Sequence, residues 1–478
     1  MKLFDSTPRE RSPLRWLILI LCCISTFGDY YCFDNPGAVH EHLESQFSFL
    51  GENFEYYYNL LYSIYSIVNI FIPFIGGYLI KIYGNKSMFL VFAIIIVLGQ
   101  LIVYLGCKNN SIYTMLIGRV IFGLGGDNLN VSQMTCVVEW FYKSENSFPM
   151  GLTLTISRVG SFLNDVLSPR FAGDTRDING KLNATNAFKW GLYLSIFSLG
   201  NVLIMSLLDT YKTKALQNEL LNNDINNNNI KDKEDNNDNN NMFYLIRKLN
   251  LMFWIISFLI LLNYGCLMPF NYMAVGFFTK NFGLSKNLAG ILMGMPFIMG
   301  AFFVPILGSV VDKFGYRAEL VFSSGFFVLV SFILFNFFKP YFPLILLGFG
   351  YSIFACVLWP SIPIAVGDKD LAGIGYGVAS GMQNISMSIH PMIIARILVK
   401  YKDYFYCLNF LVIVSLVSIL VSGYLYYINE NKYNKVLNMI TYEDEISNNP
   451  GDKTNNINLN IELSNVQNKK YNELDEEN

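Results

Sequence analysis

Apolar stretches long enough to cross a lipid bilayer as helices constrain this chain more than any other feature of its sequence. A crossing helix needs about 20 predominantly apolar residues, and twelve such stretches follow one another here. The first six are expected at residues 14–33, 56–80, 87–106, 112–141, 149–172 and 187–208, and the second six at 250–278, 288–311, 319–338, 342–366, 371–399 and 404–428. Since 53% of the 478 residues are hydrophobic, we predict an all-α polytopic membrane protein.

Polar segments divide these spans into two sets of six. We expect a cytosolic N-terminal arm (1–13), an N-terminal six-helix half (14–208), an Asn-rich cytosolic linker (209–249), a C-terminal six-helix half (250–428) and a cytosolic tail (429–478). The linker and the tail are too poor in apolar residues to bury a core, so both are predicted to be disordered. An even number of spans places both ends of the chain on one side, and the basic residues in the loops of that side predict that it is the cytosol.

Composition and motifs exclude several functional classes. A formal net charge of −2 gives no electrostatic basis for binding nucleic acid. The eight cysteines show no CxxC spacing for zinc or redox chemistry, and His40 and His42 lack further ligands for a metal. The sequence contains neither a phosphate-binding glycine loop after a strand nor a nucleophile elbow, so we predict neither an enzyme nor a bound cofactor.

A short loop pattern occurs once in each half. Its two copies have identical spacing and read Gly77-x3-Lys81-x2-Gly84-x-Lys86 and Gly308-x3-Asp312-x2-Gly315-x-Arg317. Six spans, a linker and six more spans are typical of the major facilitator fold, whose halves are repeats of each other, and the loop resembles the signature of that superfamily. The resemblance implies that the four named residues of the second copy help to hold a cytosolic gate shut, and that Lys81 replaces the acid in the first. The alternative is that these are ordinary solvated loop charges.

Two consecutive apolar stretches each carry a charge near the middle, Asp127 in the first and Arg158 in the second. They lie roughly 20 Å and 13 Å from the cytosolic face at 1.5 Å per residue, where an ionised side chain is costly unless it faces a water-filled path or a partner. Aligning Gly151 with Gly377 places Asn384 opposite Arg158, so polar groups of both halves are expected to face one midplane cavity. A carboxylate and a guanidinium about 6 to 10 Å apart match the amine and the carboxylate of a short zwitterion.

The same charges admit a structural interpretation. Asp127 could pair with Arg158 as an internal lock, or with Arg119 two helical turns away on its own stretch, because buried charges are rarely left unpaired. The interpretations are compatible, since a lock that opens when the substrate supplies both charges would couple binding to movement. We therefore count Arg119 among the candidate gating residues.

A combination of short motifs resembles one group within the superfamily, the major facilitator superfamily domain-containing protein 1 group of lysosomal dipeptide uniporters. The motifs are Asp34-Asn35-Pro36, Gly118-Arg119, Phe122-Gly123, Gly125-Gly126-Asp127, Arg158-Val159-Gly160-Ser161, Leu358-Trp359-Pro360, Gly375-Tyr376-Gly377 and Gln383-Asn384. The resemblance implies that Asp127 and Arg158 hold the amino and carboxyl ends of a dipeptide, with Asp in place of the Glu of the family. It also implies transport without a coupled ion, an accessory lumenal glycoprotein and a lysosomal or equivalent acidic-vacuole membrane.

Four further residues complete the candidate substrate site: Tyr30, Trp359, Gln383 and Asn384. The aromatic residues could line the cavity, although most aromatic side chains in such a chain serve packing and interface anchoring. Asp29 could bind a proton or a cation, or could be a solvated cap near the interface.

Other functions and modifications remain open from the sequence. The first alternative is a proton-coupled carrier of amino acids or small organic anions, with Asp29 or Asp127 carrying the proton, and the second is a receptor or scaffold that does not transport. The plasma membrane is the alternative location. Asn109 and Asn183 begin glycosylation sequons on the predicted lumenal side.

Overall fold

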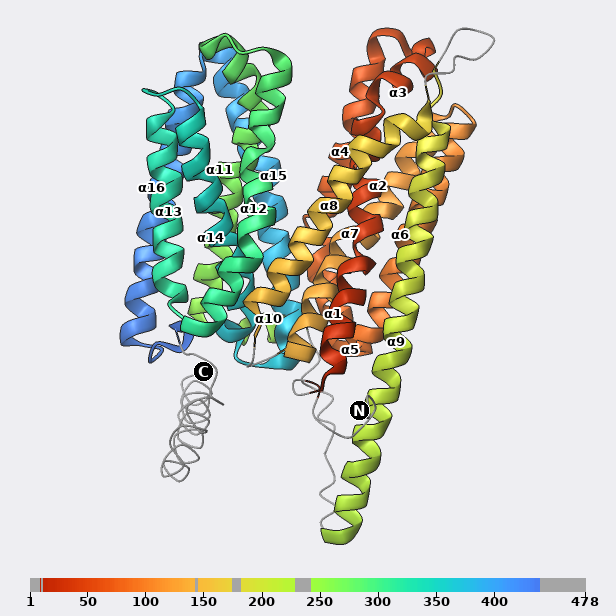
Figure 1. Cartoon of the computed structure of the whole chain (residues 1–478), viewed down its shortest axis with the longest axis vertical. Helices are drawn as coiled ribbons and strands as arrows, with labels where there is room; N and C mark the ends of the chain where they lie inside the picture. The colour runs from red at the N-terminus through yellow and green to blue at the C-terminus, as the bar shows by residue number, and fades with distance from the viewer. Residues whose placement is uncertain (1–8, 10–11, 142–144, 174–181, 228–241, 439–478) are drawn as a thin grey trace. The chain divides into compact units, whose positions relative to one another are not determined.

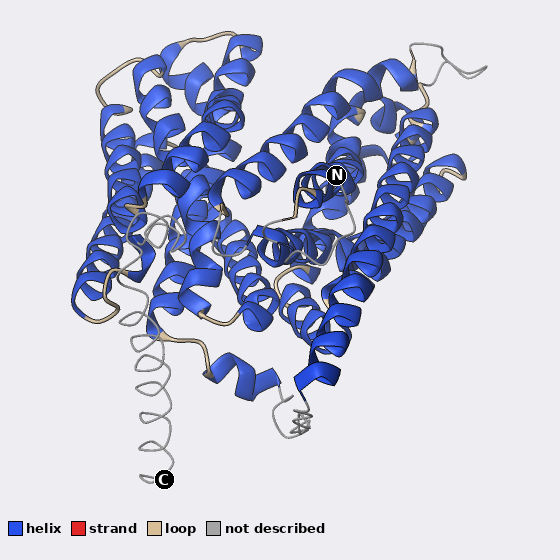
Figure 2. Ribbon diagram, turned by 60° about the horizontal axis from the view of Figure 1, so that its bottom comes forward, coloured by secondary structure: helices blue, strands red, loops and turns tan. Residues whose placement is uncertain are grey.

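The computed structural model of the chain describes residue 9 and residues 12–141, 145–173, 182–227 and 242–438. Across these ranges the chain forms helices joined by short loops and contains no strand (Figure 2). The middle of the expected linker (228–241) and most of the expected tail (439–478) lie outside the described residues.

The described helices fall into two sets, one on each side of residues 228–241 in the sequence (Figure 1). The first set comprises α1 (Leu14–Ser25), α2 (Phe27–Ala38), α3 (His40–Gln46), α4 (Phe54–Val68), α5 (Ile72–Tyr83), α6 (Asn85–Lys108), α7 (Ile112–Phe141), α8 (Ser147–Ala172) and α9 (Thr185–Asn227). The second comprises α10 (Met242–Arg247), α11 (Leu251–Phe282), α12 (Lys286–Phe314), α13 (Arg317–Leu334), α14 (Tyr341–Val366), α15 (Ala372–Tyr401) and α16 (Tyr404–Asn431). The 3-10 turns η2 (Ser48–Asn53), η4 (Lys369–Leu371) and η5 (Val436–Asn438) complete the described secondary structure.

Length and composition mark most of these helices as membrane spans. Among the described residues, 8 helices are long and apolar enough to cross a membrane, with α1 and α2 counted as one span, and the bent pair α4 and α5 makes up to 9. The long helices left out are α7, α8 and α15, which contain Asp127, Arg158 and Asn384. Polar residues lower the mean hydropathy of these helices, as expected for helices that face a cavity rather than lipid.

The second expected span is broken in the structure. Helices α4 and α5 meet at an angle of 45° across residues 69–71. Pro73 lies in the first turn of α5 and has no backbone N–H to donate to the carbonyl of Asn69, so a straight helix cannot continue through this point.

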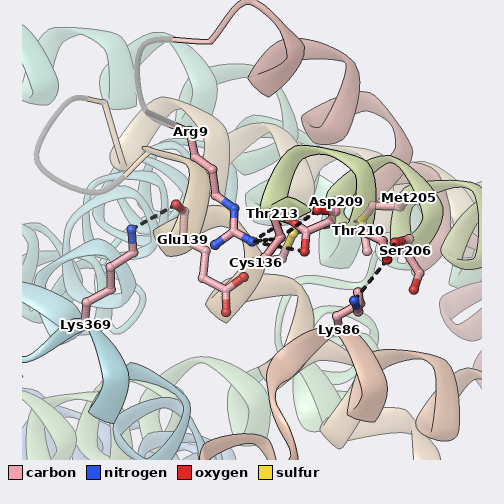
Figure 3. Close-up of polar contacts among 10 residues, drawn as sticks. All are labelled: Arg9, Lys86, Cys136, Glu139, Met205, Ser206, Asp209, Thr210, Thr213 and Lys369. Carbon is pink, nitrogen blue, oxygen red and sulfur yellow. Dashed lines mark hydrogen bonds and ion pairs between the residues drawn. The ribbon is translucent and has the colours of Figure 1, made fainter. Parts of the chain in front are cut away.

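The expected linker is helical at both of its ends, which corrects the prediction that all of residues 209–249 are disordered. Helix α9 continues through Asn227, and α10 begins at Met242. Arg9 supports the start of the continuation, since it forms an ion pair with Asp209 at 2.9 Å and donates a hydrogen bond to Thr213 at 2.9 Å (Figure 3). Residues 211–221 are also rich in Lys, Ala, Leu, Gln and Glu, which favour helix.

The start of the expected tail also belongs to the folded unit, which corrects the boundary at residue 429. Helix α16 runs on to Asn431, and the chain then turns back into η5. Asn429 is completely buried and accepts a hydrogen bond from the backbone N–H of Leu437 at 3.1 Å. Leu437 is itself only 1% exposed, so this segment buries an apolar side chain that the composition of the tail did not reveal.

The two halves meet mainly where α8 packs on α12 and where α5 packs on α15. Glycines allow both close approaches, because a Cβ added at Gly308 would lie 2.7 Å from the carbonyl oxygen of Ser147, and one at Gly77 would lie 2.4 Å from that of Gly373. These contacts lie at the end of the helices that carries Lys81, Lys313 and Arg317, which we call the basic end.

Candidate functional site

A polar cavity lies between the two halves, midway along the helices. Its empty volume, including the solvent space at its mouth, is about 720 Å³, within the range of pockets that hold small molecules. Helices α2, α7, α8, α11, α14 and α15 supply its walls. The lining residues are Tyr30, Asp127, Asn130, Gln133, Met134, Met150, Thr153, Leu154, Ser157, Arg158, Tyr264, Ala355, Trp359, Ser380 and Gln383.

Asp127 is held by side chains from two other helices. Tyr65 of α4 donates a hydrogen bond to Asp127 Oδ1 at 3.3 Å, and Asn384 of α15 donates one to Asp127 Oδ2. A Cβ added at Gly126 would lie 2.5 Å from the Tyr65 hydroxyl, so the glycine before Asp127 leaves room for this tyrosine. Since α4 belongs to the first half and α15 to the second, the carboxylate links the two halves.

The guanidinium group of Arg158 lies between two aromatic rings. Its central carbon is 5.8 Å from the ring centre of Tyr30 on α2 and 5.5 Å from that of Phe297 on α12, distances at which a cation is attracted to a ring face. Its buried Nε has no hydrogen-bond partner within the described parts of the chain. The rings therefore contact the guanidinium carbon from α2 and α12, while its Nε remains available to a guest.

Neither ion pair that the sequence left open is formed. No salt bridge links Asp127 to Arg158 or to Arg119, and all three residues are described. Arg119 instead donates to three backbone carbonyls, those of Leu61 at 3.1 Å, Cys32 at 3.3 Å and Phe33 at 3.0 Å. The acidic and basic groups of the cavity thus face it as two separate charges.

Arg119, a candidate gating residue, makes its hydrogen bonds within the first half. Its side chain is 0% exposed and lies against the rings of Phe33, Tyr62, Tyr65 and Phe122. Pro36 in α2 lacks the N–H that would otherwise bond to the carbonyl of Cys32, and Arg119 supplies the missing donor. This arrangement indicates that Arg119 joins α2 and α4 to α7.

Of the other candidate substrate residues, three line the cavity and one holds a lining residue in place. Tyr30, Trp359 and Gln383 line the cavity, whereas Asn384 is bonded to Asp127 behind it. Trp359 Nε1 donates to the hydroxyl of Tyr264 at 3.3 Å, which orients both rings. Sequence reasoning did not identify Tyr264, Tyr65 or Phe297, and the Gly125-Gly126 pair was the signal that a neighbouring side chain comes close to α7.

The second copy of the loop pattern forms a compact polar contact at the basic end. Asp312 accepts hydrogen bonds from the backbone N–H groups of Ser147 at 2.9 Å and Phe148 at 2.8 Å, which begin α8 in the other half. Arg317 lies 3.1 Å from Asp312, and their side chains are only 8% and 5% exposed. This contact is favourable because a carboxylate is stabilised at the positive end of a helix dipole. It joins the two halves because Asp312 lies in the second half and the start of α8 lies in the first. Gly315, with φ of 74°, makes the turn between Asp312 and Arg317.

The first copy makes a weaker contact of opposite polarity. Lys81 pairs with Asp370 at 3.6 Å, and the Asp370 side chain is 78% exposed, so the pair contributes little to stability. Lys369 donates to the backbone carbonyl of Glu139 at 3.0 Å and adds a second link (Figure 3). Although Lys81 replaces the acidic residue of the pattern, the first copy still contacts the other half, through a lysine instead of a carboxylate.

Polar contacts between the halves occur at two levels of the described structure. Those found among the described residues lie midway along the helices, as with Asp127 and Asn384, or nearer the basic end, as with Asp312 and Ser147. None of them lies at the opposite end. The halves are therefore held together at the depth of the cavity and at the basic end.

The remaining candidates lie apart from the cavity wall. Asp29 is only 3% exposed, and its Oδ1 has no hydrogen-bond partner among the residues that the structure covers. Asn109 and Asn183 are exposed, and Asn183 accepts a hydrogen bond from the backbone of Thr185 at 2.7 Å. His40 and His42 belong to no group of metal-binding side chains in the described ranges.

Relatives of known function resemble nearly the whole chain. The lysosomal dipeptide transporter MFSD1 of Homo sapiens is 30% identical over 421 residues, which are 87% of this chain and 86% of the relative. The protein of the same name from Danio rerio is 28% identical over 80% of each chain.

Solved structures agree on the fold. The transporter FucP, solved in an outward conformation, has a TM-score of 0.65 at 12% identity and covers 85% of this chain and 98% of its own. The human organic anion transporter MFSD10 has a TM-score of 0.61 at 13% identity, over 86% and 100% of the two chains. The family model of the Major Facilitator Superfamily matches residues 22–220 and 253–441. These matches confirm the predicted fold of two six-helix halves, and the chain belongs to the major facilitator superfamily of membrane transporters.

Proposed function

We propose that this transporter carries short zwitterionic peptides, dipeptides above all, across a lysosomal or equivalent acidic-vacuole membrane. The observation that carries the proposal is that Asp127 and Arg158 line one cavity between the halves without pairing with each other. Charges kept at mid-membrane depth are costly, and a guest that supplies both opposite charges offsets that cost. The relatives named lysosomal dipeptide transporters support both the substrate class and the membrane.

The two clamps act on different ends of the peptide. The peptide amine binds the Asp127 carboxylate, whose oxygens already accept hydrogen bonds from Tyr65 and Asn384 and so are fixed in position. The peptide carboxylate takes a two-pronged hydrogen bond from Arg158, whose guanidinium carbon lies near the rings of Tyr30 and Phe297. The proposal favours peptides over free amino acids because the relatives that match most of the chain are named dipeptide transporters.

Movement follows from the position of the contacts between the halves. With the halves joined at the basic end, substrate reaches the cavity from the opposite end, which the distribution of basic residues identifies as the lumen. Rocking of one half against the other then breaks the contacts of Asp312 with α8 and opens the basic end to the cytosol. In this proposal the peptide gradient alone drives transport. No coupled ion is needed, and the protein acts as a uniporter.

Uptake into proteoliposomes tests this proposal. Without a pH gradient, a labelled dipeptide should enter, whereas its N-acetylated form and the free amino acids should enter at least tenfold more slowly. Asp127→Asn should abolish the preference for the free amine, and Asp127→Glu should retain it because the charge remains. Equal uptake of free and acetylated dipeptides by the unmodified protein contradicts the amine clamp.

Asp29 gives a specific reason to test proton coupling as the second function. A buried carboxylate without a hydrogen-bond partner on Oδ1 is costly when charged, so the group could take up a proton on the acidic side. A proton-coupled carrier would accumulate substrate when a pH gradient is imposed, and Asp29→Asn would remove that accumulation. A uniporter shows the same final level of uptake with and without the gradient.

A further inference from the structure

The segment that follows α16 folds back onto the basic end. After Asn431 the chain reverses through Asn434 and Lys435, both with left-handed φ angles of 46° and 59°. The buried Asn429 fixes this reversal, because its backbone carbonyl accepts from the N–H of Lys435 at 2.8 Å and its side chain accepts from the N–H of Leu437. Residues 432–438, which we call the return segment, are therefore built into the fold.

The return segment caps the start of α13. Tyr316, the residue before this helix, has a φ of 57° and supplies no side-chain cap. Asn438 takes that role, since its Oδ1 accepts from the N–H of Ala318 at 3.0 Å and its Nδ2 donates to Glu319 at 2.8 Å. A Cβ at Gly315 would lie 2.3 Å from the Asn438 carbonyl oxygen, so Gly315 also leaves room for the segment.

The same segment holds the cation of the gate. The backbone carbonyl of Leu437 accepts from Arg317 Nη1 at 3.4 Å, while Nη2 of the same side chain contacts Asp312 at 3.1 Å and the hydroxyl of Ser147 at 3.4 Å. The Arg317 guanidinium thus lies between the return segment on one side and the contact between the halves on the other. Leu437 is 1% exposed, which anchors its carbonyl in place.

We infer that Leu437 and Asn438 are positioning residues for the gate at the basic end. By fixing Arg317 and the first turn of α13, they keep the Asp312 carboxylate aimed at the first N–H groups of α8, so the gate re-forms after each opening. The inference rests on the proposed rocking of the two halves. It does not depend on which solute is carried.

Labelling from the basic side tests the inference without any substrate. A cysteine introduced at the cavity-lining Ser380, in a chain whose native cysteines are replaced, reacts with an impermeant thiol reagent added on that side only when the gate opens. Asn438→Ala should raise the labelling rate about threefold to tenfold, the factor expected when one or two hydrogen bonds that favour the closed gate are lost. Deletion of residues 439–478 should leave the rate unchanged.

Two further variants separate positioning from folding. Asn438→Asp combined with Glu319→Gln keeps both hydrogen bonds with donor and acceptor exchanged in the side-chain pair, and should restore the original rate. Lys435→Gln removes only the exposed ion pair with Glu430 and is the matched control with no effect. Substrate uptake by Asn438→Ala should show a lower maximal rate with the thermal melting temperature preserved.

Each result has a definite meaning. Unchanged labelling and uptake in a normally folded Asn438→Ala protein overturn the positioning role. A labelling rate that rises as expected while dipeptides are not transported leaves the positioning role standing and rejects the proposed substrate.

Discussion

Asn384 in α15 donates a hydrogen bond to the carboxylate of Asp127 in α7, and this bond joins the two halves at the depth of the cavity. The amide is one of two groups that hold the carboxylate, and the Tyr65 hydroxyl is the other. Because the bond crosses between the halves, the proposed rocking would require it to break or be remade. We therefore expect substitution of Asn384 to affect movement as well as substrate binding.

Asn384→Asp places a second carboxylate against Asp127, and two carboxylates in contact repel each other unless one is protonated. Uptake by this variant should be strongly reduced at pH 7.5 and should recover at pH 5, where a shared proton replaces the lost donor. Transport assays at the two pH values check this. Asn384→Leu cannot take up a proton, so its defect should be the same at both, and a pH-independent defect in Asn384→Asp would contradict the expectation.

Arg158→Lys keeps the positive charge and loses the flat fork that lies between Tyr30 and Phe297. An ammonium group cannot form the two parallel hydrogen bonds with a carboxylate, so the KM for a dipeptide should rise about tenfold, equivalent to about 1.4 kcal/mol. Dipeptide amides, which lack the terminal carboxylate, should be transported equally poorly by both proteins. Competition assays with the two ligands measure the difference, and an equal loss of affinity for both would show that Arg158 does not recognise the carboxylate.

The sequence predicted the spans well and their bends poorly. Apolar runs set the extent of helices such as α7, which begins and ends where the sequence indicated, because a membrane helix must satisfy its own backbone. Hydropathy does not report the direction of a helix axis, so the break before Pro73 was missed. It also gives no signal for a helix that continues through polar residues, so the extension of α9 to Asn227 was missed.

The candidate site shows the same limit. Asp127 and Arg158 could be singled out because charges in apolar runs are rare, and the structure places both in one cavity. The partners of these charges could not be predicted, since the contact of Tyr65 with Asp127 depends on how α4 is rotated against α7. The spacing of apolar and polar residues in a single sequence does not show how α4 is rotated against α7.

Arg119→Met should destabilise the protein more than it alters substrate recognition. The change leaves the buried carbonyl of Cys32 without a donor, since Pro36 has no N–H to offer it, and removes one hydrogen bond each from the carbonyls of Leu61 and Phe33. An unsatisfied buried carbonyl costs about 1–3 kcal/mol. We expect a clear fall in the melting temperature of the detergent-purified protein, measured by tryptophan fluorescence. Asp127→Asn is the comparison, because it should reduce transport with little change in melting temperature. The reverse pattern would support a gating role for Arg119.

Gly308→Ala should interfere with closure of the basic end. Its new Cβ would lie 2.7 Å from the carbonyl oxygen of Ser147, a backbone atom that cannot move aside alone, so α8 and α12 must separate and Asp312 loses its short bonds to the start of α8. Thiol labelling of a cysteine at Ser380 from the basic side should become faster, and the maximal rate of uptake should fall severalfold. Gly294→Ala is the matched control on the same helix, since its Cβ would meet nothing within 4 Å, and alanine is a better helix former than glycine. If both substitutions slow uptake equally, helix flexibility rather than close packing explains the loss, and the gate is not limited by the α8–α12 crossing.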